Sequence, residues 1–146
     1  MFVGRLVALI EANADDLASL VQRRLFEEGR TAAYHRLPPA EVCLRARRVF
    51  ARLGSWLERA SDQALEEEYE ELGRIRRLEG IPLSEVVLAL LVTRRALWEF
   101  VDSQPADTVL EVRQQLDLEL LVVPFFDRAI YYTVRGYESA AVPAHR

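Results

Sequence analysis

Apolar residues recur at steps of three and four along nearly the whole chain. This spacing places them on one face of an α-helix, whereas a half-buried strand alternates at steps of two. In the first segment the apolar series consists of Val3, Val7, Ile10, Ala14, Leu17 and Val21. No segment alternates in the manner of a strand. The pattern therefore predicts an all-α protein.

Glycines and prolines divide this pattern into separate helices. We expect Gly29 to cap the first helix and Gly80 the third, since glycine adopts the left-handed cap conformation without strain. Pro38–Pro39 and Pro82 suit the first turn of a helix, where a missing N–H costs no hydrogen bond. The predicted helices span residues 1–29, 38–60, 62–79, 83–102 and 107–138, with residues 30–37 as a connector. We expect one domain over residues 1–146, built as a bundle of about five to six helices.

Gly73 lies within the third predicted helix, away from its ends. A glycine there is unfavourable for helix stability, so it needs a structural reason. We expect that it lets another helix approach closely.

The last predicted helix is the longest and has two apolar stripes. One stripe consists of Leu116, Leu120, Val123, Ile130, Val134 and Tyr137; the other of Leu118, Val122, Phe125, Ala129 and Tyr132. Two apolar stripes require two partners, so we assign the first to the chain's own core and the second to a homodimer interface. Deeper burial of both stripes within one subunit is the alternative. Pro124 lies inside this helix and predicts a kink, because proline removes one backbone hydrogen bond and clashes with the preceding turn.

Charge and composition narrow the function classes. The formal net charge is −4 without a basic stripe, which argues against nucleic-acid binding. No apolar run is long enough to span a membrane, and the first 22 residues lack a signal-peptide layout. The single cysteine, Cys43, is typical of a reducing compartment. These features together predict a cytoplasmic protein.

No motif predicts catalysis, a metal site or a cofactor. All 19 basic residues are arginine, which excludes lysine Schiff-base chemistry and a P-loop lysine. His35 and His145 are the two histidines, and neither belongs to a zinc-binding pattern. No nucleophile elbow is present. We therefore expect no enzyme and no cofactor; haem bound through His35 is an alternative.

Two surfaces could bind other molecules. A small apolar ligand could lie between the fourth and fifth predicted helices, in a pocket lined by aromatic residues. The residues assigned to that pocket are Trp98, Phe100, Phe126 and Tyr131. The acidic run Glu66–Glu71 suits a solvated helix face, or alternatively the docking surface of a helical adaptor.

Three parts of the sequence resemble a known family. The run from Leu72 to Val87, LGRIRRLEGIPLSEVV, resembles the central signature of the RsbRD-type N-terminal domain. The segments from Tyr34 to Leu57 and from Phe125 to Tyr132 are similar to it as well. That family includes the sensor domains of RsbT co-antagonist proteins and domains that precede histidine kinases.

This resemblance implies a globin-like fold without haem, and a function in signalling. It implies a non-catalytic sensor that dimerises and passes a signal to an output domain or protein, as in stress-response signalling.

Overall fold

The computed structural model describes residues 4–58 and 62–140, and every regular element in these ranges is helical. The elements are α1 (Gly4–Ala12), α2 (Ala14–Glu27), the 3-10 turn η1 (Gly29–Thr31), α3 (Ala32–His35), α4 (Pro39–Ala51), α5 (Leu53–Glu58), α6 (Asp62–Leu78), α7 (Leu83–Asp102) and α8 (Val109–Ser139). The all-helical class is confirmed. The described residues form eight α-helices, more than the five or six predicted. Residues 1–3 and 59–60, which were assigned to predicted helices, lie outside the described residues.

Two predicted helices are each divided in two. The first breaks at Asn13, whose side-chain amide donates a hydrogen bond to the carbonyl of Leu9 at 2.8 Å. Asparagine side chains compete with the helical backbone in this way. The second breaks at Arg52, where the backbone leaves the helical region with φ −119° and ψ 17°. Periodicity missed both breaks because the apolar spacing continues across them.

The predicted connector at residues 30–37 folds into η1 and α3. Thr31 is fully buried, and its hydroxyl donates to the carbonyl of Leu25 at 2.7 Å. The backbone N–H of Ala33 donates to a carboxylate oxygen of Glu85 at 2.8 Å, which joins this segment to α7. Gly29 does not adopt a left-handed cap, because α2 already ends at Glu27 and Gly29 begins the 3-10 turn. Such short elements have too few residues to show a period.

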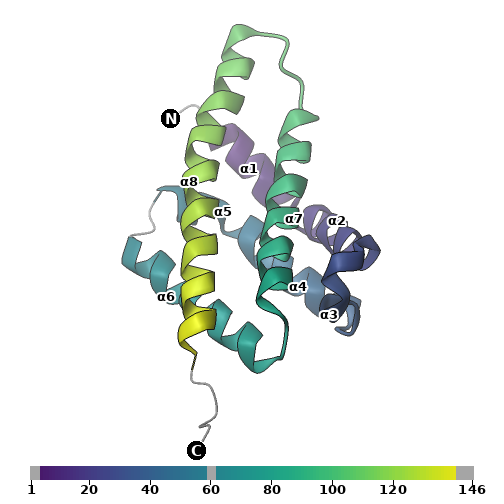
Figure 1. Cartoon of the computed structure of the whole chain (residues 1–146). Coiled ribbons are helices and arrows are strands. Elements are labelled where there is room, and N and C mark those ends of the chain that lie inside the picture. Colours follow the sequence, from purple (N-terminus) through teal and green to yellow (C-terminus); the bar gives the residue numbers. More distant parts are fainter. Residues whose placement is uncertain (1–3, 59–61, 141–146) are drawn as a thin grey trace, which may run out of the picture.

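Helices α7 and α8 are the two longest, and the 103–108 loop joins them as an antiparallel pair (Figure 1). Helices α1, α2, α5 and α6 contact this pair, most extensively α6 against α8, whereas α4 packs on α2. The largest fully buried side chains include Phe50 of α4 and Phe125 and Phe126 of α8. The core therefore lies between α8 and the N-terminal helices.

Helices α6 and α8 cross at two glycines. A Cβ on Gly73 would lie 2.0 Å from the carbonyl oxygen of Thr133, and one on Gly136 would lie 2.0 Å from that of Glu70. No side chain fits at such distances, so the two backbones touch directly. The expected role of Gly73 is confirmed, and Gly136 is its counterpart on α8. Gly80, with φ 78°, follows the end of α6 as predicted.

Helix α8 spans 31 residues and includes Pro124. Its first turn is held by a capping box, in which Glu111 N–H donates to the Thr108 hydroxyl and Thr108 N–H donates to the Glu111 carboxylate, both at 3.1 Å. The helix assignment continues through Pro124, and the kink there stays a prediction. No helix among the described residues has the length and apolar character needed to cross a bilayer.

Candidate functional site

The stripe of α8 assigned to a dimer interface lies in the core of the chain itself. Its residues are at most 8% exposed, and they are Leu118, Val122, Phe125, Ala129 and Tyr132. As placed here, these side chains offer no surface to a second subunit. We correct the assignment accordingly: the stripe assigned to a second subunit faces the chain's own core. Spacing alone could not tell which stripe faces the other helices.

The other face of α8 is apolar and exposed. Along its N-terminal half it presents Val109 (89% exposed), Val112 (45%), Leu116 (52%), Leu120 (74%) and Val123 (41%). We call these five residues the α8 stripe. Their steps of three and four place them on one side of the helix, opposite the buried residues Leu118 and Val122. A monomeric protein rarely leaves such a continuous apolar surface in water.

A groove of about 520 Å³ between α7 and α8 lies next to the stripe. Its apolar wall consists of Leu88, Leu91, Val92, Trp98, Val122 and Val123, and its charged residues are Glu28, Arg30, Arg94, Arg95, Glu99 and Glu119. This is where an aromatic pocket was predicted, between the fourth and fifth predicted helices.

The four aromatic residues assigned to that pocket are not brought together. Trp98 lines the groove, whereas Phe126 is 1% exposed in the core. Tyr131 is 58% exposed, and Phe100 lines a separate shallow depression beside α2. The quartet therefore does not form one pocket, because its members point to different sides of α7 and α8.

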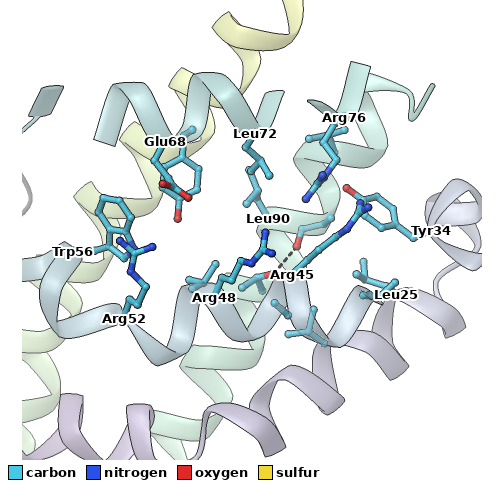
Figure 2. A pocket seen from close by; sticks show the side chains of 18 residues that line it. Leu25, Tyr34, Arg45, Arg48, Arg52, Trp56, Glu68, Leu72, Arg76 and Leu90 are labelled. Carbon is cyan, nitrogen blue, oxygen red and sulfur yellow. Dashed lines mark hydrogen bonds between the residues drawn. The ribbon is translucent and has the colours of Figure 1, made fainter. Parts of the chain in front are cut away.

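A second cavity, which the sequence did not predict, lies between α2, α4, α6 and α7 (Figure 2). Its volume is about 110 Å³, and its floor is made of buried aliphatic side chains. Those side chains are Val21, Leu25, Val42, Val86, Ala89 and Leu90. Four arginines and one glutamate also line it: Arg45, Arg48, Arg52, Arg76 and Glu68.

Two of these arginines, the partly buried Arg45 and the buried Arg76, share a carboxylate at one end of the cavity. Arg45 donates to both oxygens of Glu79, at 3.0 and 2.6 Å, and to Glu41 at 3.1 Å. Arg76, only 7% exposed, donates to Glu79 at 3.2 Å. Burial lowers the pKa of the Arg76 guanidinium, and the positive charge of Arg45 acts in the same direction. Burial likewise raises the pKa of the neighbouring Tyr34 phenol.

The opposite end of the cavity is aromatic. Trp56 and Tyr69 have ring centroids 6.0 Å apart, and both contact Phe125 of α8. Burial raises the pKa of the Tyr69 phenol. The Arg52 guanidinium lies 5.0 Å from the Trp56 ring centroid, in a cation–π contact. The cavity thus has an end lined by paired arginines, an apolar floor and an aromatic wall.

The cavity residues do not fit haem. No histidine or cysteine lines the cavity. His35 lies outside it, with Nε2 2.7 Å from the carbonyl oxygen of Leu25 and its ring 5.3 Å from that of Phe26. Among the described residues no group of three His, Cys, Asp or Glu side chains could hold a metal ion.

The acidic run on α6 is partly engaged within the chain. Glu66 and Glu70 both pair with Arg135 of α8, at 3.5 and 3.2 Å. Glu67 accepts a hydrogen bond from Gln63, and Glu71 pairs with Arg74. The run therefore helps to hold α6 against α8, and an adaptor surface there stays a prediction.

Sequence reasoning missed the arginines of the cavity. Arg45 and Arg48 of α4 and Arg52, the residue directly after it, follow one another at steps of three and four, the spacing of one helix face. That spacing was the available signal. It was hidden because arginines at such steps are common on solvated helices, and their position over a cavity depends on α6.

Comparisons with known proteins give a family match. The model of the RsbT co-antagonist protein rsbRD N-terminal domain matches residues 8–142, nearly the whole chain. This confirms the resemblance seen in the sequence. No curated protein and no solved structure matches the chain.

Proposed function

The chain belongs to the RsbRD N-terminal domain family, a family of signalling domains, and from that premise we propose that it is a non-catalytic sensor and dimerisation domain. It acts in the bacterial cytoplasm, in a signalling protein of the stressosome or histidine-kinase type, and passes its signal to an output domain or protein. The proposal includes a globin-like arrangement of the helices, without haem.

The α8 stripe is the observation that supports dimerisation. Its five apolar side chains cover more than three turns of helix on the face opposite the core. Steps of three and four are the spacing by which two helices pair along a seam. A second copy of the same helix therefore suits this surface.

The charges of the α7–α8 groove support a partner of the same sequence. Arg94 and Arg95 of α7 and Glu119 of α8 line the groove, and no ion pair joins these three within the described residues. In a twofold dimer each surface contacts a copy of itself, so residues of both signs can pair across the axis. The groove thus provides both halves of an intersubunit ion pair.

The crossing of α6 and α8 provides a route for the signal. Gly73 and Gly136 hold the two backbones in contact, and Arg135 pairs with two carboxylates of α6. A displacement of α6 therefore moves α8, whose outer face forms the dimer seam. Packed helix interfaces switch between discrete arrangements, so such a displacement is passed on as a change in the dimer.

The dimer is tested by placing charge on the α8 stripe. The double variant Leu116→Glu/Leu120→Glu puts two carboxylates at the centre of the seam and should give monomers in sedimentation velocity, while the wild type sediments as a dimer. Both positions are exposed in the single chain, so the fold is retained and circular dichroism should be unchanged.

Leu110→Glu is the matched control. Leu110 is 53% exposed on the same helix but lies off the stripe, so this variant should stay dimeric. A monomeric wild type, or a double variant that still dimerises, contradicts the proposed interface.

A further inference from the structure

We infer that the cavity between α4 and α6 binds a small organic monoanion, in which one carboxylate is joined to a compact apolar group. The inference rests on the proposed sensor function and names the chemical class of its signal. The carboxylate binds Arg48 at the mouth of the cavity, and the apolar group occupies the aliphatic floor.

The buried end of the cavity is already neutral. Arg45 and Arg76 are two cations, and Glu41 and Glu79 are the two carboxylates that contact them. An anion is therefore not needed to balance the charge there. The ligand's charge must be matched elsewhere in the cavity.

Beyond that neutral group, the lining of the cavity itself has one surplus positive charge. Arg48 of α4 and Arg52 directly after it lie on one side and Glu68 of α6 on the other, and all three are exposed (Figure 2). Within the described residues none of the three side chains forms a salt bridge or hydrogen bond, although that of Arg52 stacks on Trp56. Two cations facing one carboxylate leave a net charge of about +1, which matches a monoanion.

Arg48 is placed to bind the carboxylate. Figure 2 shows its guanidinium directed into the space between α4 and α6, toward the same end as Arg45 and Arg76. Arg48 itself is exposed, so its guanidinium can be reached from solvent. The guanidinium fork suits a carboxylate because it can donate two parallel hydrogen bonds.

The floor of the cavity is suited to an apolar group. Its one polar side chain, Thr93, donates its hydroxyl hydrogen to the carbonyl of Ala89 at 2.8 Å, so no unpaired buried side-chain donor competes for the ligand. The volume of about 110 Å³ is of the same order as an engineered apolar cavity of about 150 Å³ that accepts benzene. A phenyl ring or a short alkyl chain matches this space.

The cavity is open to solvent between α4 and α6. A depression of about 560 Å³ lies at its mouth and shares Arg45, Arg48, Arg52, Trp56 and Glu68 with it. Glu67 and Glu71 also line the depression, where Gln63 donates a hydrogen bond to Glu67 and Arg74 pairs with Glu71. A ligand can enter through this depression and leave its carboxylate at the arginines. Leu72 and Arg76 of α6 also line both spaces, so a bound ligand contacts the helix that holds α8.

Calorimetry with defined probes tests the ligand class. Phenylacetate and hexanoate should bind the full chain, whereas the neutral phenylacetamide and inorganic phosphate should bind at least about tenfold more weakly, since each lacks one half of the ligand. Failure of both carboxylates to bind overturns the inference. Equal binding of phenylacetamide or of phosphate overturns it as well.

Two variants locate the site. Arg48→Gln should weaken phenylacetate binding by about tenfold or more, and Arg47→Gln should leave it unchanged, because Arg47 pairs with Asp15 outside the cavity. Ala89→Leu fills the floor and should abolish binding in a protein whose circular dichroism is unchanged. Equal effects of Arg47→Gln and Arg48→Gln contradict the site.

The monomeric stripe variant separates this inference from the proposed function. Leu116→Glu/Leu120→Glu leaves the cavity intact and should bind phenylacetate as the wild type does. Binding that persists in monomers supports the cavity site independently of the dimer. Loss of binding in that variant contradicts a site within one chain.

Discussion

Tyr132 illustrates how a single side chain joins two helices. Its hydroxyl donates to a carboxylate oxygen of Asp62 at 2.6 Å, which connects α8 to the first residue of α6. Arg128, one turn earlier on α8, contacts the other oxygen of Asp62 at 3.3 Å. The sequence placed Tyr132 in an apolar stripe, and its ring is indeed buried in the core. The partner of its hydroxyl depended on how α6 crosses α8.

The hydrogen bond to Asp62 should make the protein sensitive to alkaline pH. It raises the pKa of Tyr132 to about 12, and burial acts in the same direction. The unfolded chain has the ordinary value of about 10, so the stabilisation is fully present below about pH 10 and is lost as the pH rises through about 12. In an ultraviolet titration of phenolate, Asp62→Asn should move one tyrosine down toward the ordinary value.

Asp127→Asn is the control for this titration. Asp127 is exposed on α8, and its carboxylate has no hydrogen bond or ion pair within the described residues. Removing this charge should therefore leave all tyrosine titrations unchanged. An unchanged titration in Asp62→Asn would show that this carboxylate does not hold the proton on Tyr132.

The crossing of α6 and α8 is the clearest feature at the scale of elements. Glycine is a poor helix former, so two glycines inside helices need a compensating contact. Gly73 and Gly136 each lie against the backbone of the opposite helix. The unusual residue at position 73 was visible in the sequence. Its partner at position 136 was not recognised, because the pairing of two distant helices is a tertiary property.

Replacing either crossing glycine by alanine should separate the helices. The new methyl group meets a backbone carbonyl at 2.0 Å in both Gly73→Ala and Gly136→Ala, and backbone cannot move aside as a flexible side chain can. We expect the free energy of unfolding, measured with urea, to fall by about 1–3 kcal/mol or more. Gly29→Ala should be close to neutral, because no atom lies within 4 Å of the position that its new methyl group would take, and its φ is not positive. Equal stability of all three variants would rule out the close crossing.

Two helix breaks were not visible in the apolar spacing. Apolar spacing continues through Asn13 and Arg52, although the helix ends at both. The period reports which residues face the core. It does not report local backbone angles. At Asn13 the backbone leaves the helical region, and the side-chain amide donates a hydrogen bond to the carbonyl of Leu9.

The proposed dimer concerns the whole molecule, and it should make stability depend on protein concentration. A partner that binds only the folded chain stabilises it by mass action. The thermal midpoint of the wild type should therefore rise with protein concentration, whereas that of Leu116→Glu/Leu120→Glu should not. Differential scanning calorimetry over a range of concentrations measures both. Parallel behaviour of the two proteins would contradict a folded dimer at the stripe.

The family and the helical class followed from the sequence alone. Both depend on local patterns: apolar steps of three and four, and the LGRIRRLEGIPLSEVV run around Gly80. The same pattern showed that α8 has two apolar faces. These properties are encoded in residues close together in the chain, so a single sequence displays them.

Which face of α8 is buried was decided only by the tertiary structure. Leu118 and Leu120 are equally hydrophobic and both lie on α8, yet one is 0% and the other 74% exposed. The difference arises from the packing of the helices, which places Leu118 in the core and leaves Leu120 on the uncovered side of α8. The cavity arose in the same way, since its arginines come from α4 and α6 and meet only when these helices pack. A hydrophobic pattern determines that a face must be covered, whereas the geometry of packing determines what covers it.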